Sequence, residues 1–292
     1  MVVLSAGDLE ATFAPEIGMV GSSFRHRGEE LLAQRGGLGE YAETGSTFGI
    51  PLLHPWANRL GTMRYGQVEL DPQRSPIRLE ENGLPIHGLL SASPHWDVIE
   101  QEDGFLAARF SFDRPELLAA FPYPHELSVA ATVGDSALRI ETTIRPTGVL
   151  AVPISFGYHP YLTLPGVPRA EFLVDLPVTA RAQLDERGIP TGASDPVDFE
   201  PGPLGQQTFD DLFPDIAAGS RFGLEGGGRR IDVVCEEGYP FAQVFAPEGQ
   251  DFICYEPMTA PTNALVTGDG LRRVEPGAEF SARFAISVSE TE

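Results

Sequence analysis

Glycine and proline interrupt this chain so often that long helices are excluded. The 292 residues include 32 glycines and 26 prolines, and these are distributed along the whole sequence. In a helix interior, a glycine costs about 1 kcal/mol and a proline about 3 kcal/mol relative to alanine. The best candidate for a helix is the short run 115–120. The chain is therefore expected to consist of short extended segments joined by turns.

The segments between these turns alternate apolar and polar residues with a period of two. The alternation is clearest in 106–112, 127–133, 138–144 and 280–288, and residues 134–136 predict a turn between two of them. Side chains two positions apart share one face of a strand, so the pattern indicates half-buried antiparallel strands. Many such strands at regular spacing predict an all-β fold, either a sandwich or a barrel.

Nothing in the sequence divides the chain into parts. There is no internal repeat, no low-complexity tract and no linker, so we expect a single domain over residues 1–292. The stretch 188–205 is rich in proline, glycine and aspartate, which predicts a long loop within that domain.

The charge of the chain excludes several classes of partner. All 20 basic residues are arginines, and they stand against 42 aspartates and glutamates, for a formal net charge of −22. Such a surface repels phosphate backbones and anionic membranes, so neither nucleic acid nor membrane is an expected partner. The lack of lysine excludes lysine Schiff-base chemistry. Two isolated cysteines, no signal-peptide pattern and no apolar run of membrane length predict a cytoplasmic protein.

Four polar segments interrupt the β pattern, each with histidine, arginine or carboxylate residues close to glycine or proline. They are 48–60 (FGIPLLHPWANRL), 82–90 (NGLPIHGLL), 156–165 (FGYHPYLTLP) and 254–264 (CYEPMTAPTNA). Glycine and proline end ladder pairing and fix the backbone, as a rigid site at the end of a strand requires. Glu256 follows an apolar segment directly, which predicts a carboxylate at the mouth of a sheet.

Other site chemistries lack a matching pattern. No two histidines stand at metal-ligand spacing, so no metal site is predicted. There is no GxSxG motif, and Cys254 lies in an apolar segment where a thiol is expected to be buried and inert. The histidines outside the polar motifs, together with His54, are interpreted as structural or surface residues: His26, His54, His95 and His125.

Taken together and in this order, the motifs resemble the aldose 1-epimerase (galactose mutarotase) family. The resemblance rests on 49–60, 86–90 (IHGLL), 156–162 (FGYHPYL), 210–213 (DDLF) and 256–263 (EPMTAPTN). It covers nearly the whole chain. The fold that the resemblance implies is a large antiparallel β-sandwich, the galactose mutarotase-like supersandwich.

The resemblance also implies an activity, the interconversion of α and β anomers of a free hexose such as glucose or galactose without cofactor or metal. A base takes the proton from the C1 hydroxyl while an acid protonates the ring oxygen. The ring opens, the C1–C2 bond rotates, and the ring closes on the other face. Glu256 matches the family's base and His159 its acid. The positions that match substrate-binding residues are His87, Arg59, Asn58 and Asp210.

We expect these six side chains to line one concave site, with Glu256 and His159 on opposite sides of a gap the size of a sugar. Asp211 is a second candidate for the aspartate, because it directly follows Asp210. The segment before Glu256 is shorter than in larger mutarotases, so a substrate-contacting glutamine of those enzymes has no clear counterpart. His54 stands where relatives often carry an apolar residue.

Two alternatives remain within the enzyme class. A hexose-6-phosphate 1-epimerase of the same superfamily would need further arginines around a phosphate, and Arg64, Arg74 and Arg78 are candidates. The net charge of −22 opposes this reading. A glycosidase would instead use Glu256 together with Asp210 or Asp211, at a separation that the sequence does not give.

A third alternative is a carbohydrate-binding protein without catalysis, which would not need both Glu256 and His159. The expected partner is a small sugar in every case. The sequence leaves open which sugar it is and whether the protein is a monomer or a homodimer.

Overall fold

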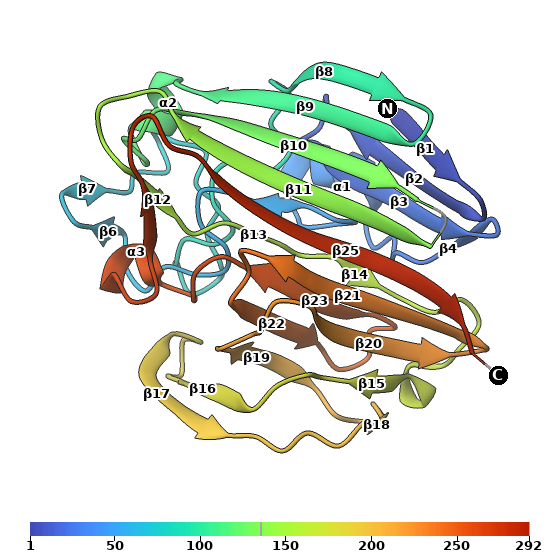
Figure 1. Ribbon diagram of the computed structural model, residues 1–292. Coiled ribbons are helices and arrows are strands. Elements are labelled where there is room, and N and C mark those ends of the chain that lie inside the picture. Colours follow the sequence, from blue (N-terminus) through green and yellow to red (C-terminus); the bar gives the residue numbers. More distant parts are fainter. Residues whose placement is uncertain (135, 292) are drawn as a thin grey trace.

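A nine-stranded antiparallel sheet is the largest element of the computed structural model, which describes residues 1–134 and 136–291 (Figure 1). Its strand order is β18 (Gly202–Pro203), β15 (Leu173–Asp175), β20 (Ser220–Gly226), β21 (Arg229–Glu237), β25 (Phe280–Glu290), β11 (Ala137–Pro146), β10 (His125–Val133), β9 (Phe105–Phe112) and β8 (Asp97–Glu102). The four alternating segments of the sequence are β9, β10, β11 and β25, which are consecutive neighbours here. The predicted turn at 134–136 includes Asp135, which lies outside the described residues.

A six-stranded sheet packs on the first. It runs β19 (Phe209–Phe213), β22 (Phe241–Ala246), β23 (Ile253–Met258), β13 (Gly157–Tyr158) and β5 (Leu52–Leu53), and β14 (Tyr161–Leu162) also pairs with β23. Aromatic residues join the sheets: the rings of Tyr158 and Phe284 lie 4.9 Å apart, and the Tyr255 hydroxyl donates to the Gly223 carbonyl at 2.6 Å. The expected all-β antiparallel sandwich is confirmed.

Smaller elements surround these sheets. A four-stranded sheet contains β1 (Val2–Ala6), β2 (Leu9–Ala14), β3 (Val20–His26) and β4 (Glu29–Glu30). Three two-stranded ribbons pair β6 (Arg64–Tyr65) with β7 (Val68–Glu69), β12 (Val152–Ile154) with β24 (Arg272–Val274), and β16 (Ala180–Leu184) with β17 (Pro190–Pro196). The helical segments are α1 (Gly37–Thr44), α2 (Pro115–Leu118), α3 (Ala264–Thr267) and the 3₁₀ turn η1 (Arg169–Glu171). None of the helices in the described part of the chain has the length and apolarity to cross a membrane.

Two local predictions differ from the structure. The stretch 188–205 contains β17 and β18 rather than a continuous loop, and β17 buries almost none of its side chains. A strand without a buried face needs no apolar alternation, so its sequence carried no signal. Helix α1 was not expected, because it contains two glycines and buries only Tyr41.

Alternation along β23 determines where a site can form. Tyr255 points from this strand into the nine-stranded sheet. Its neighbour Glu256 therefore points to the opposite face of the six-stranded sheet. Glu256 lies within the strand, which continues to Met258, and not at a strand end as expected.

Candidate active site

All six residues selected from the sequence line one cavity of about 200 Å³. They are Asn58, Arg59, His87, His159, Asp210 and Glu256, and the other lining residues are Arg35, Thr47, Glu80, Ile86, Tyr161 and Phe245. Larger hollows of about 490 and 520 Å³ lie elsewhere. Among the described residues, the contact between His159 and Glu256 is the only one in which a histidine lies within 4.0 Å of a carboxylate.

The floor of the cavity is one face of three neighbouring strands. Gln243 of β22 lies directly opposite Glu256 of β23, and Phe245 lies opposite Asp210 of β19. Directly paired residues and residues two positions apart share a face, so these four side chains point the same way. The Gln243 amide donates a hydrogen bond to Asp210 Oδ1 at 2.6 Å.

The wall of the cavity comes from two loops with unusual backbone conformations. Asn58 and His87 have φ of 55° and 61°, a region that residues other than glycine rarely occupy. The two loops are joined because the His87 N–H donates to the Asn58 carbonyl at 2.9 Å. A side chain at Gly88 would place its Cβ 2.2 Å from the His54 carbonyl oxygen. The residue after His87 in the motif must therefore be glycine on steric grounds. Strained backbone at ligand-facing residues is typical of functional sites.

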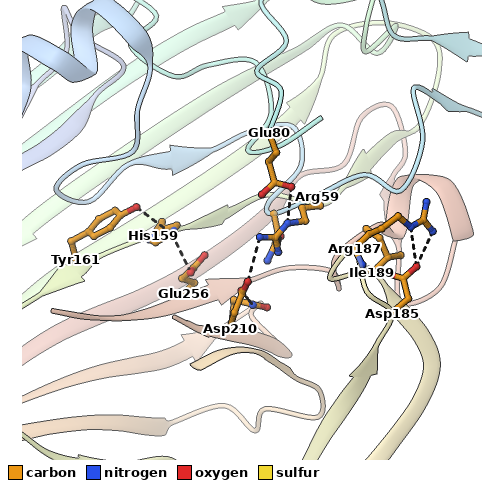
Figure 2. A network of polar contacts seen from close by, with 11 residues as sticks. Arg59, Glu80, His159, Tyr161, Asp185, Arg187, Ile189, Asp210 and Glu256 are labelled. Carbon is orange, nitrogen blue, oxygen red and sulfur yellow. Dashed lines mark hydrogen bonds and ion pairs between the residues drawn. The ribbon is translucent and has the colours of Figure 1, made fainter. Parts of the chain in front are cut away.

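Glu256 and His159 touch each other directly. Glu256 Oε1 lies 3.2 Å from His159 Nε2, and the two side chains are 2% and 6% exposed. The Tyr161 ring stacks on the His159 ring with centroids 4.4 Å apart and planes 8° from parallel. Figure 2 shows the three side chains in a row. The expectation of a sugar-sized gap between Glu256 and His159 is therefore wrong: they stand side by side.

Burial shifts the protonation of both partners toward their neutral forms. Burial raises the pKa of Glu256 well above its usual range, and the negative charge of Asp210 adds to the effect. Burial, followed by the positive charge of Arg35, lowers the pKa of His159 to about 3. The pKa of His87 is lowered well below its usual value, mainly by burial. Burial therefore favours the neutral carboxylic acid of Glu256 and the neutral imidazole of His159, and because the two groups touch, they bind and release protons as one pair.

Arg59 links opposite rims of the cavity. Its Nε donates to Glu80 at 2.7 Å, and its Nη2 donates to Asp210 at 3.3 Å (Figure 2). Its Nη1 lies 3.3 Å from the side-chain oxygen of Asn58. The Arg59 side chain is only 17% exposed, so the guanidinium is held as part of the wall.

The structure also decides which of the residues that the sequence left open line the cavity. Asp210 lines the cavity, whereas Asp211 points to the other face of β19 and pairs with Arg181 at 3.6 Å. His54 is buried outside the cavity, where its Nε2 lies 2.8 Å from Nε2 of His125. Sequence reasoning missed Gln243, although the pairing of its strand with β23 would have placed it beside Glu256.

Unpartnered polar atoms concentrate in this site. Ten buried side-chain nitrogen or oxygen atoms of the described residues lack a hydrogen-bond partner. Four of the ten are His87 Nδ1, His159 Nδ1, Gln243 Oε1 and Glu256 Oε2. His87, His159 and Glu256 line the cavity, and Gln243 lies beside it on Asp210. Buried polar groups are normally hydrogen-bonded, so these free atoms favour a polar ligand with several donors and acceptors.

No metal centre is recognisable in the part of the chain that the structure describes, because no three histidine, cysteine or acidic residues come close enough to hold an ion. The site contains arginines, hydroxyls, an amide and an acid/base pair. Such a set suits an uncharged, hydroxyl-rich molecule.

Several known proteins are similar to this chain in sequence or in fold. YihR of Escherichia coli K12, an uncharacterised protein, is 26% identical over 255 residues, covering 81% of this chain and 80% of YihR. A galactose mutarotase-like protein from Clostridium acetobutylicum shares the fold with a TM-score of 0.85 at 19% identity, over 99% and 95% of the two chains. Galactose 1-epimerase from Lactobacillus acidophilus NCFM has a TM-score of 0.77 at 14% identity, over 98% and 92% of the chains. The family description of aldose 1-epimerase matches residues 5–287, and the chain belongs to this family.

Proposed function

We propose that the protein is an aldose 1-epimerase that interconverts the α and β anomers of a free hexose such as glucose or galactose. The observation that carries this proposal is the buried contact of 3.2 Å between Glu256 and His159 in a cavity whose lining residues carry three unpartnered polar atoms. A pure carbohydrate-binding protein would gain nothing from burying an acid/base pair, which costs free energy. Membership of the family supports the same reaction.

The reaction needs a base and an acid at the same time, and one proton transfer supplies both. Moving the shared proton from Glu256 to His159 leaves a carboxylate and an imidazolium. The Glu256 carboxylate takes the proton from the C1 hydroxyl, and His159 gives its proton to the ring oxygen as the C1–O5 bond breaks. After rotation about C1–C2, His159 recovers the proton from the C5 hydroxyl. The C5 oxygen then attacks C1 on the opposite face, and Glu256 returns the proton to O1.

The remaining residues of the site bind and orient the sugar. Arg59, Asn58 and His87 offer donors on one wall, while Asp210 and Gln243 offer an acceptor and an amide on the floor. Holding the sugar in one orientation removes the entropic cost of bringing both proton-transfer groups to it.

Polarimetry on freshly dissolved α-glucose and α-galactose tests the proposal. We expect the optical rotation to relax faster with the protein than in buffer alone, in proportion to protein concentration. A relaxation rate equal to that of buffer for both sugars would refute it. The cytoplasmic location, the single domain, the absence of a cofactor or metal and the monomeric or homodimeric state remain predictions from the sequence.

A hexose 6-phosphate is the second candidate substrate, and two arginines favour it. Arg35 lines the cavity, and the positive charge of Arg78 acts on both His87 and His159. Among the described residues, Arg35 and Arg78 have no carboxylate within 4.0 Å, and each donates to a backbone carbonyl.

The other two arginines considered from the sequence lie outside the cavity. Arg64 donates to the Gly66 carbonyl, and Arg74 lines a different hollow. A direct comparison of anomerisation rates for glucose and glucose 6-phosphate distinguishes the two substrates.

A further inference from the structure

The turn of the β16–β17 hairpin lies beside the side chain of Arg59. In Figure 2, Arg59 lies between the His159–Glu256 pair on one side and the turn residues Asp185 and Arg187 on the other. We propose that this turn, through Gly188, positions the Arg59 guanidinium in the sugar site. The inference rests on the proposed function and adds a positioning residue that touches neither substrate nor reacting atoms.

The turn is a rigid element. Asp185 Oδ1 accepts hydrogen bonds from the N–H groups of Arg187 and Ile189 at 2.9 and 3.0 Å, and the Asp185 carbonyl accepts from the Gly188 N–H at 2.9 Å. The Arg187 guanidinium also forms an ion pair with Asp185 at 2.8 Å. A side chain that organises its own turn in this way fixes the backbone conformation of the segment.

The hairpin is anchored to the strands and loops that carry the site. Ala182 and Leu184 of β16 pack on a buried cluster of Leu53, Ala57, Leu212 and Met258. These cluster residues belong to the same segments as Asn58, Asp210 and Glu256. Arg187 Nη1 also donates to the carbonyl of Gly61, two residues after Arg59, at 3.3 Å. The position of the turn is therefore tied to the position of the site.

Gly188 is the point of contact. A Cβ added at this residue would lie 3.0 Å from Arg59 Nη1 and 3.5 Å from its Cζ. The residue has φ of +72°, so both its backbone conformation and its contact favour glycine. Glu80, Asp210 and Asn58 hold Nε, Nη2 and Nη1 by hydrogen bonds, and a side chain at Gly188 would push against the Nη1 end of the guanidinium.

Three variants separate the contact from the backbone conformation. Gly188→Ala adds both a Cβ and backbone strain. Gly188→Asn adds the Cβ, but asparagine tolerates the left-handed region. Gly192→Ala is the matched control in the same hairpin, because Gly192 has φ of +90° and a Cβ there would meet nothing within 4 Å.

We expect both Gly188 variants to raise KM for the sugar about three- to tenfold, the size of a weakened hydrogen bond to a charged group, with a smaller change in kcat. Gly192→Ala should leave KM unchanged. Equal KM values in all three variants and the parent would overturn the positioning role. A recovery of the parent KM in Gly188→Asn would also overturn it, because strain and not the contact would then be responsible.

A readout independent of activity is the Nε–H signal of Arg59 in ¹H–¹⁵N spectra, assigned by its loss in Arg59→Lys. Displacement of the guanidinium from Glu80 should speed hydrogen exchange of this signal in the Gly188 variants and not in Gly192→Ala. Unchanged exchange in the Gly188 variants would refute positioning. A parent protein without mutarotation would refute the proposed function instead, and the exchange measurement would still decide the role of Gly188.

Discussion

The buried pair of His54 and His125 should make the fold labile to acid. The two Nε2 atoms lie 2.8 Å apart, and His125 Nδ1 lies 2.6 Å from the Tyr123 carbonyl oxygen. A carbonyl only accepts, so His125 carries its proton on Nδ1, and its Nε2 accepts the Nε2–H of His54. His54 Nδ1 is then a free lone pair among the rings of Phe112 and Phe156. A proton on His54 Nδ1 would place a charge in this apolar environment. A proton on His125 Nε2 would do the same and would also set two N–H groups against each other.

The direction of the histidine pKa shift determines whether the fold loses stability in acid or in alkali. Burial lowers the pKa of His125 to about 4, although its hydrogen bond to Tyr123 opposes the change. In the unfolded chain, the histidine binds its proton near pH 6.5. The free energy of unfolding therefore keeps its full value above that pH and decreases as the pH falls toward 4. At pH 5 the loss from His125 alone is about 2 kcal/mol. The pKa of His54 is lowered well below its usual value, mainly by burial, and acts in the same direction. A domain is typically stable by only about 5–15 kcal/mol, so the effect is measurable.

Urea unfolding at pH 7, 6 and 5 measures this loss, with His54→Leu/His125→Phe as the comparison. The phenylalanine keeps the stacking on Phe112, whose ring lies 4.5 Å from that of His125. Between pH 7 and 5, the free energy of unfolding of the double variant should fall by at least about 2 kcal/mol less than that of the parent. His95→Gln, a change at an exposed histidine, should leave the pH dependence unaltered. Identical pH dependence in the parent and the double variant would refute the reasoning. If the double variant does not fold, an NMR signal of His125 that titrates above pH 5 in the parent would refute it equally.

Further predictions concern the acid/base pair and metal. Glu256→Gln should keep the melting temperature and sugar binding but lower kcat at least about 100-fold, because the amide keeps the shape and loses the basic oxygen. A stable Glu256→Gln protein with normal kcat, measured on the same preparation, would contradict the assignment. His159→Asn should behave similarly, and the double variant should be little slower than either single one, since the two groups act as one unit. Exhaustive chelation should leave the mutarotation rate unchanged, and a loss of activity that zinc restores would overturn the metal-free mechanism.

The fold was predictable where a strand has one buried face. Strands β9, β10, β11 and β25 each bury alternate side chains, so their sequences carried the period-two signal and their boundaries were nearly correct. Strand β17 is exposed on both faces and gave no such signal. Alternation of apolar and polar residues indicates that one face of a strand is buried, and it does not indicate the strand conformation itself. The pairing order of the sheets has no local signal, because it depends on contacts between distant segments.

The site was predictable as a set of residues but not as a geometry. The six side chains that the sequence selected are half of the twelve residues that line the cavity. Five of them come from motifs in which glycine or proline fixes the backbone, and Asp210 was selected through the family resemblance alone. Sequence spacing did not show that Glu256 contacts His159, because β23 and the segment after β13 are far apart in the chain. It also gave no signal for Gln243, whose place depends on the register between β22 and β23.

Burial changes the chemistry that ordinary pKa values would assign to this site. With its usual pKa, Glu256 would be ionised at pH 7, and the rate would fall in acid as it took up a proton. Burial raises the pKa of Glu256 well above that usual value, so the carboxyl group holds its proton to higher pH than an exposed glutamate does. The lowered pKa of His159 prevents the pair from taking up a second proton until the solution is strongly acidic. Between these two limits the pair keeps one proton, which is the number that simultaneous acid and base catalysis requires. The rate should therefore fall on the alkaline side, where the pair of Glu256 and His159 loses that proton.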